Sequence, residues 1–120
     1  MKEETKRWWE KAQDDLEKAR ILFKNKKYDG TVFFCQQSIE KGLKAVMLKE
    51  KNTLKKIHDL VALGKEVALP SNLLEYCKEI TSSYIYARYP DIEEQEDMEG
   101  IAKRFLIFSE EVLQWIRKKL

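Results

Sequence analysis

The side chains best suited to acid–base, nucleophilic or metal chemistry are few in this sequence. There is one histidine, His58, and there are two cysteines, Cys35 and Cys77. A zinc site built on two histidines is therefore excluded, and neither cysteine is spaced from His58 like a metal ligand. The four glycines are isolated, so no glycine-rich phosphate loop occurs, and no serine stands in a Gly-x-Ser-x-Gly turn. We predict no metal site, no cofactor and no local catalytic motif.

Three short segments hold the remaining candidates for a site. They are Gln36-Gln-Ser-Ile-Glu-Lys-Gly-Leu-Lys-Ala45, Lys56-Ile-His-Asp-Leu60 and Tyr84-Ile-Tyr-Ala-Arg-Tyr-Pro-Asp91. Each has a plain structural interpretation, which is favoured when the segment is taken alone. Glu40 and Lys44 form an i, i+4 helix pair worth a few tenths of a kcal/mol. His58 stands in a loop beside a helix cap, and Arg88 stacks on tyrosines or pairs with the acidic residues that follow it.

The same segments also contain the groups that bind phosphates and bases. Arg88 offers a planar fork for a phosphate, and Lys41 and Lys44 add point charges. Tyr86 or Tyr89 could stack a base.

The elements that must position these residues are all predicted to be helices. In residues 3–24 one apolar stripe is expected, with the charged residues, Asp15 among them, on the other side. The stripe consists of Trp8, Ala12, Leu16, Ala19 and Phe23. A second helix over 29–50, with cap candidates in Asp29-Gly-Thr31, places Val32, Cys35, Ile39, Gly42, Leu43 and Val46 on one broad face. Gln37, Lys41 and Lys44 fall nearly opposite that face, and Gln36 and Glu40 lie at its edge.

The second half of the chain predicts three more helices. A polar connector over 51–56 precedes a short helix that Asp59 caps. Leu69-Pro-Ser71 interrupts the pattern, and a fourth helix runs from about residue 72 to the Tyr86–Asp91 segment. A last helix over 97–119 has two apolar faces, so it needs neighbours on two sides. The expected fold is all-α, an antiparallel up-and-down bundle of four to five helices.

Length and composition are consistent with this fold. The chain has 120 residues, of which 43% are hydrophobic and 37% charged, with a net charge of +2. We expect one domain over 1–120, neither disordered nor membrane-embedded. The near balance of charge disfavours non-specific nucleic-acid binding. With no signal peptide in the sequence, we expect a cytoplasmic protein whose two cysteines are buried and inert, although a disulfide is not excluded.

Taken together and in order, the three segments resemble a known family. Phe33-Phe-Cys-Gln-Gln-Ser-x-Glu-Lys-x-Leu-Lys-Ala45, then His58-Asp-Leu60, then Tyr86-Ala-Arg-Tyr-Pro-Asp91 is similar to the HEPN (higher eukaryotes and prokaryotes nucleotide-binding) domain. The resemblance implies a helical bundle like the substrate-binding domain of nucleotidyltransferases, and usually a homodimer. Stand-alone members often act beside a separate minimal nucleotidyltransferase, as a toxin–antitoxin-like pair.

The resemblance also implies a possible activity, because many HEPN proteins are metal-independent ribonucleases. Their site is an arginine followed by four to six residues and a histidine. Lys51, Asn52 and Thr53 stand where that arginine would precede His58, so the local motif is absent. A composite site of His58 and Arg88 would need the fold to bring them together.

Three hypotheses follow for the function. The first is a non-catalytic module that binds a nucleotide and a minimal nucleotidyltransferase; its ligand residues are Gln37, Glu40, Lys41, Lys44, His58, Arg88, Tyr89 and Asp91. The second is a ribonuclease in which His58 is the general base or acid and Arg88 stabilises the transition state. The third is a structural homodimer in which Glu40 bridges to Arg88 and Gln37 bonds to the 86–91 segment.

Overall fold

The computed structural model describes residues 1–88 and 97–120, and for residues 83–88 it describes the backbone alone. All regular structure within these residues is helical, which confirms the predicted fold class. The helices are α1 (Glu3–Lys24), α2 (Tyr28–Lys51), α3 (Leu60–Glu66), α4 (Ser71–Arg88) and α5 (Met98–Lys119). None of the described helices combines the length and apolarity that crossing a membrane requires.

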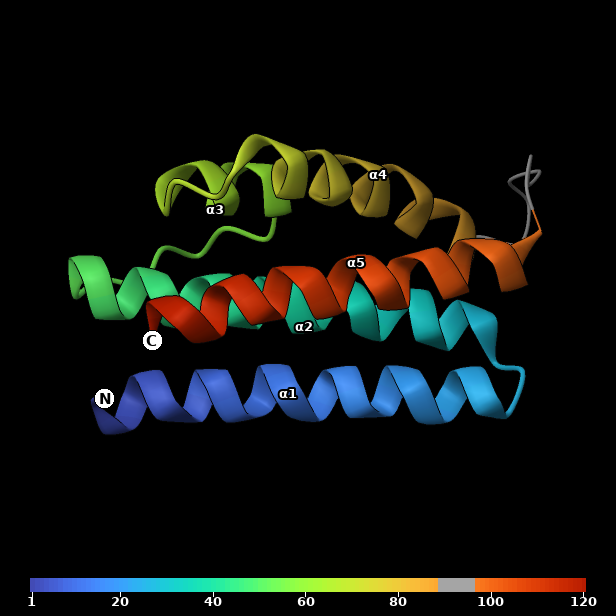
Figure 1. Ribbon diagram of the computed structural model, residues 1–120, viewed down its shortest axis with the longest axis horizontal. Helices are drawn as coiled ribbons and strands as arrows, with labels where there is room; N and C mark the ends of the chain where they lie inside the picture. Colours follow the sequence, from blue (N-terminus) through green and yellow to red (C-terminus); the bar gives the residue numbers. More distant parts are fainter. Residues whose placement is uncertain (89–96) are drawn as a thin grey trace.

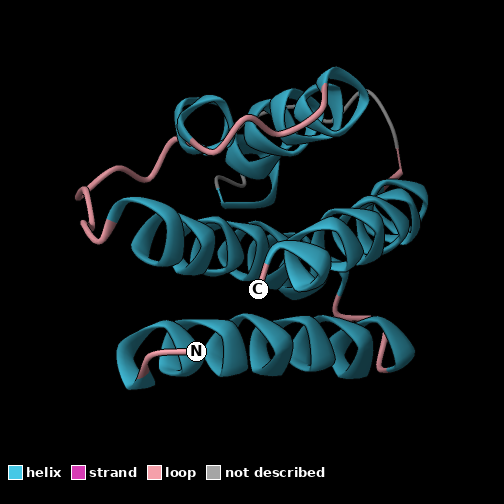
Figure 2. Cartoon of the chain, turned by 60° about the vertical axis from the view of Figure 1, so that its left-hand side comes forward, coloured by secondary structure: helices cyan, strands magenta, loops and turns pink. Residues whose placement is uncertain are grey.

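The helices form three layers (Figures 1 and 2). α1 makes the first layer, α2 and α5 lie side by side in the middle, and α3 and α4 cover the other side. α1 runs antiparallel to α2, and α4 runs antiparallel to α5. The resulting bundle is elongated, measuring 41 × 24 × 23 Å.

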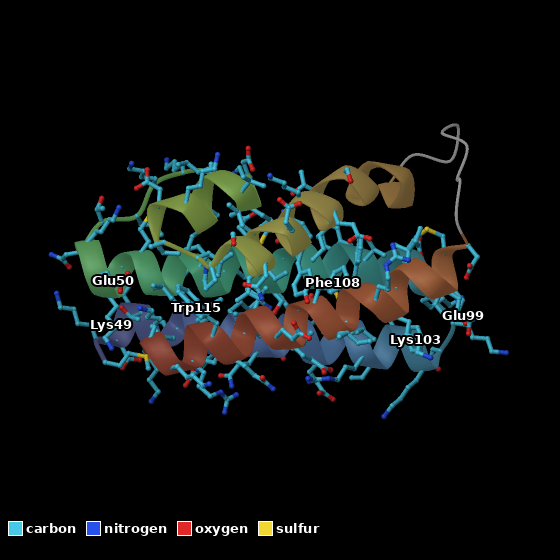
Figure 3. All side chains as sticks on the ribbon, turned by 45° about the horizontal axis from the view of Figure 1, so that its top comes forward. Lys49, Glu50, Glu99, Lys103, Phe108 and Trp115 are labelled. Atoms are coloured by element: carbon cyan, nitrogen blue, oxygen red, sulfur yellow. The ribbon has the colours of Figure 1, made fainter. Side chains whose placement is uncertain are left out.

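The core lies around α2 and α5, whose side chains fill the space between the layers (Figure 3). The predicted apolar face of α2 is fully buried, as are large inward side chains of α3, α4 and α5. These buried residues include Val32, Cys35, Ile39, Leu43, Val46, Leu60, Leu63, Ile80, Phe105, Val112 and Ile116. At Gly42 an added Cβ would lie only 2.8 Å from Cδ1 of Ile116, so glycine permits the close approach of α2 and α5.

Side-chain caps fix two of the helix starts. The Asp59 carboxylate accepts hydrogen bonds from the backbone N–H groups of Val61 at 2.9 Å and Ala62 at 3.3 Å, as predicted. Asp97 accepts one from Gly100 at 2.7 Å at the start of α5. The predicted cap in Asp29-Gly-Thr31 is wrong, because α2 already begins at Tyr28 and no side chain caps it.

A tight connection explains this earlier start of α2. Lys26 adopts a left-handed conformation with φ of 60°, and the Lys27 N–H bonds to the Leu22 carbonyl at 2.8 Å. Thr31 is therefore inside the helix and buried, where its hydroxyl donates to the Ala19 carbonyl at 3.1 Å. It ties α2 to α1 instead of capping α2.

The stripe predicted for α1 needs two corrections. Trp9, 8% exposed, enters the core, whereas Trp8 is only half-buried against it. Asp15, predicted on the solvent side, is fully buried. Both differences arise from how far α1 is rotated about its axis, which α2 and α5 decide together.

The two cysteines are free and buried, as predicted. Burial raises the pKa of the Cys35 thiol to about 12, and it does the same for Cys77. Both are therefore protonated thiols at neutral pH, and they behave as small apolar core groups.

Candidate functional site

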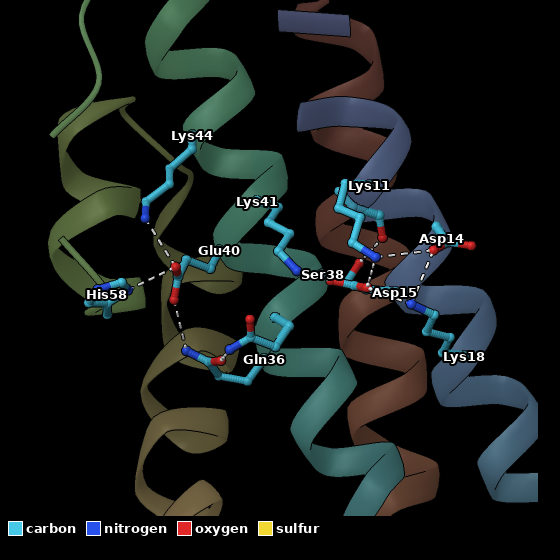
Figure 4. A network of polar contacts seen from close by, with 12 residues as sticks. Lys11, Asp14, Asp15, Lys18, Gln36, Ser38, Glu40, Lys41, Lys44 and His58 are labelled. Carbon is cyan, nitrogen blue, oxygen red and sulfur yellow. Dashed lines mark hydrogen bonds and ion pairs between the residues drawn. The ribbon is translucent and has the colours of Figure 1, made fainter. Parts of the chain in front are cut away.

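Glu40, on α2, is the centre of a buried polar network (Figure 4). Its side chain is almost fully covered, with the residue only 6% exposed. Oε2 accepts a hydrogen bond from Lys44 Nζ at 3.1 Å and lies 3.0 Å from Nδ1 of His58. Oε1 accepts from Gln36 Nε2 at 3.4 Å, and Gln36 in turn accepts from Gln37 at 2.8 Å. Each carboxylate oxygen thus has a partner.

Lys44 is buried, which corrects its predicted place on the polar side of α2. The residue is 5% exposed, and Nζ lies 5.5 Å from the ring centroid of Trp8 on α1. α1 packs against that side of α2, so the lysine is covered by a neighbouring helix. A buried ammonium is tolerable here because Glu40 neutralises it and the indole ring attracts it.

His58 differs from the rest of the network because its side chain is 80% exposed. It lies in the connection between α2 and α3, one residue before the capping residue Asp59. Only Nδ1 is engaged, by Glu40; Nε2 has no partner among the described residues. A carboxylate that accepts from Nδ1–H orients the ring and leaves Nε2 open to solvent as a proton acceptor.

A second polar cluster surrounds the buried carboxylate of Asp15, on the side of α2 that faces α1 (Figure 4). Lys41 donates a hydrogen bond to Oδ2, and Lys11 and Lys18 lie 3.5 and 3.8 Å from Oδ1. Oδ1 itself makes no hydrogen bond within the described part of the chain. Asp14 pairs with the same two lysines, at 3.3 Å each. The lysines around these carboxylates therefore outnumber them.

Next to this cluster the surface is hollowed between α1 and α2. The hollow has a volume of about 280 Å³ and is lined by Arg7, Trp8, Lys11 and Lys41. Its exposed lining is almost entirely apolar, so the indole ring and the hydrocarbon stems of the three cationic side chains face it, and their charged ends lie around it. Lys44 lies on the same ring, so the Glu40 network and the hollow meet at Trp8.

A larger hollow of about 470 Å³ lies between α1 and α5. Its lining consists of Gln13, Leu16, Arg20, Glu110, Leu113, Gln114 and Arg117. Arg20 and Glu110 are paired across it at 3.4 Å. It contains none of the residues that the sequence analysis named as site candidates.

The structure brings together only part of the site predicted from sequence. Gln37, Glu40, Lys44 and His58 belong to one network, and Lys41 lies in the neighbouring Asp15 cluster. The other three predicted residues lie outside the described part of the structure. For Arg88 only the backbone is described, and Tyr89 and Asp91 are not described at all. Among the described residues no group of histidine, cysteine and acidic side chains is arranged to hold a metal ion.

Sequence analysis missed three residues that the structure places at these sites. Trp8 was placed in the core stripe although it is only half-buried, Asp15 was assigned to the solvent side, and Arg7 was not considered. The only signal in the sequence was the doubled Trp8-Trp9, since one of two adjacent tryptophans on a helix must leave the centre of the apolar stripe.

Comparisons with known proteins agree with this architecture. The family model of the HEPN domain matches residues 5–119. The crystal structure of TT1696 from Thermus thermophilus is 25% identical, with a TM-score of 0.84 over 97% of this chain and 98% of that one. ST0689, an archaeal HEPN homologue, is 25% identical, with a TM-score of 0.77 over 98% of each chain. No curated protein matches the chain.

Proposed function

The chain belongs to the HEPN domain family, and from this premise we propose that it is a non-catalytic helical module that binds a nucleotide and a protein partner. Its partner would be a minimal nucleotidyltransferase, in a two-component, toxin–antitoxin-like system, and the module itself would act as a homodimer. Two-fold dimers are the commonest assemblies of small soluble proteins.

The observation that best supports nucleotide binding is the placement of the two α2 lysines. Lys41 lines the hollow beside Trp8, and Lys44 lies 5.5 Å from the same ring. Cations next to an aromatic surface suit a ligand that carries both a phosphate and a base. The neighbouring carboxylates of Asp15 and Glu40 hold both lysines in place before any ligand arrives.

The experiment that tests the partner is a native pull-down of the full chain at moderate salt from the organism that encodes it. Mass spectrometry and RNA staining then identify what is retained. A small nucleotidyltransferase is expected. A clean homodimer that carries neither protein nor RNA contradicts the proposal.

Nucleotide binding is tested separately by thermal unfolding with and without ATP. Wild-type protein is expected to be stabilised by ATP, and Arg88→Ala is expected to lose that stabilisation while its ligand-free Tm stays within about two degrees of wild type. Lys103→Ala, at an exposed position on α5, is the matched control. If Arg88→Ala unfolds instead, Arg88 is a structural residue.

The contact between Glu40 and His58 favours a second candidate function, a metal-independent ribonuclease. A histidine oriented by a buried carboxylate and open to solvent at Nε2 can take the proton from a ribose 2′-hydroxyl. The 2′-oxygen would then attack the adjacent phosphorus, and the 5′-oxygen would leave with a proton taken from water. Arg88 would stabilise the negative charge on the oxygens bound to phosphorus. Cleavage of single-stranded RNA in EDTA, lost in His58→Ala, would support it, and no cleavage would exclude it.

The closed pairing within the network fits a third role, a structural homodimer. Gln36, Glu40 and Lys44 satisfy one another, and no ligand is needed to explain their burial. A dimer that retains no partner in the pull-down and gains no stability from ATP would favour this role.

A further inference from the structure

We propose that the hollow beside Trp8 binds a single nucleotide, whose base stacks on the indole and whose phosphate is held by Arg7. The inference rests on the proposed nucleotide-binding function. The inference goes beyond that function because it assigns the base and the phosphate to residues of α1 that lie outside the sequence motifs.

The first argument concerns the ring of Trp8. Trp9, its neighbour, is 8% exposed and takes the place in the core, so Trp8 is left half-buried with part of its surface in the hollow. An indole is an effective surface for a base, because every base has a π-face that stacks without a specific hydrogen-bond pattern. Lys44, held by Glu40, fixes the ring from the α2 side.

The second argument concerns the charges that line the hollow. Lys41 is already paired with the buried Asp15, and Lys11 shares Asp14 and Asp15 with Lys18. Arg7 is different: it is exposed, and no residue in the described part of the chain forms a hydrogen bond or ion pair with it. Its guanidinium is therefore available for a phosphate, which it matches with two parallel N–H···O bonds.

The third argument concerns size and net charge. At about 280 Å³ the hollow lies just below the usual range for ligand pockets, which suits one nucleotide rather than several. The residues that line it include three cationic side chains and no carboxylate. The local excess of positive charge attracts an anionic ligand over a neutral one.

The test measures the binding of three compounds, ADP, ribose 5-phosphate and adenosine, to the full chain by calorimetry. Trp8→Leu is expected to weaken ADP binding at least about tenfold and to leave the affinity for ribose 5-phosphate unchanged, because only the base loses its stacking surface. Trp115→Leu is the matched control. Trp115 is a half-buried tryptophan on α5 (Figure 3) with Lys119 5.3 Å from its ring, yet it is not in the hollow.

The phosphate is tested by Arg7→Gln, with Lys103→Gln on α5 as the control for loss of one exposed positive charge. Arg7→Gln is expected to weaken the binding of both ADP and ribose 5-phosphate at least about fivefold and to leave the affinity for adenosine unchanged. Since Arg7 is on the surface, this variant tests the site even if Trp8→Leu fails to fold.

Two results would overturn the inference in different ways. ADP binding that survives both Trp8→Leu and Arg7→Gln but is lost in Arg88→Ala would place the nucleotide elsewhere, and the proposed function would stand. If the wild-type chain binds none of the three compounds, the nucleotide-binding function fails together with the inference.

Discussion

Oε2 of Glu40 lies 3.0 Å from Nδ1 of His58, so a carboxylate buried on α2 holds an exposed imidazole of the connection to α3. The same oxygen accepts a hydrogen bond from Lys44, which is as buried as Glu40 itself. Removal of the Glu40 carboxylate would therefore affect its two partners differently. His58 is already in water, whereas Lys44 would be left as a buried ammonium without a counter-charge.

Glu40→Gln is expected to destabilise the fold by about 3–5 kcal/mol, because it leaves the Lys44 charge buried without a counter-charge. His58→Ala is expected to cost less than about 1 kcal/mol, since that side chain is in water. Urea unfolding measures both. In the double variant Glu40→Gln/Lys44→Met the loss should be smaller than the sum of the two single losses. A cost below about 1 kcal/mol for Glu40→Gln would contradict the predicted penalty for an unpaired Lys44.

Glu66 gives the fold a dependence on acid pH. Its carboxylate accepts hydrogen bonds from Lys51 and Lys55 at 2.8 Å each, and these lower its pKa from 4.5 to about 2. Because the carboxyl pKa is lower in the folded than in the unfolded chain, the ionised carboxylate stabilises the folded state at pH values above the unfolded pKa. This contribution is lost as pH falls from about 4.5 to about 2.

The comparison that checks this is the Tm of wild type and Glu66→Gln from pH 7 to pH 2. Wild type should have the higher Tm at neutral pH, and the difference should shrink below about pH 4.5 and vanish near pH 2. Added salt should reduce the difference, because all three side chains are partly exposed. Glu75→Gln, which removes an exposed pair on α4, is the control. A difference that does not change with pH would contradict the assignment.

Gly42 and Ile116 are predicted to be energetically coupled. An added Cβ at Gly42 would meet Ile116 Cδ1 at 2.8 Å, so Gly42→Ala overpacks the contact between α2 and α5 and should cost about 1 kcal/mol. Ile116→Val removes that methyl group. The double variant should be more stable than additivity predicts by at least about 0.5 kcal/mol in chemical denaturation. As a control, the stability losses of Gly42→Ala and Ile80→Val on α4 should be additive in the double variant. Additive losses for Gly42→Ala and Ile116→Val would contradict the predicted contact.

Neither cysteine is expected to react in the folded protein. With pKa values of about 12, Cys35 and Cys77 have almost no thiolate at pH 8, and both are buried. Iodoacetamide at pH 8 followed by mass spectrometry should find both unmodified without denaturant and both alkylated in urea. Fast alkylation of either one in the native protein would show that its helix opens readily.

Most of the fold was predictable from the sequence because its signals are local. Apolar spacing of three and four residues located the helices, and the Asp59 cap was correctly identified. The start of α2 was predicted to within one residue, but its cap was wrong, because the chain enters α2 through the left-handed Lys26, and nothing in the sequence indicates that conformation for a lysine.

The site was less predictable because its contacts link residues distant in the chain. The Glu40–Lys44 pair could be predicted because it lies within one helix, but its burial follows from the packing of α1. The Glu40–His58 contact spans 18 positions and depends on the path of the connection between α2 and α3. Lys41 and Asp15 lie 26 positions apart, and nothing local in either segment indicates their pairing.

The order of the three layers has a consequence for communication within the molecule. Among the described residues α1 contacts only α2 and α5, and it reaches neither α3 nor α4. A signal from the Trp8 hollow to the α3–α4 layer must therefore cross the middle layer. Lys44 touches Trp8 on one side and Glu40 on the other, and Glu40 holds His58. These side chains form one continuous series of contacts across α2, from Trp8 on one face to His58 on the opposite face.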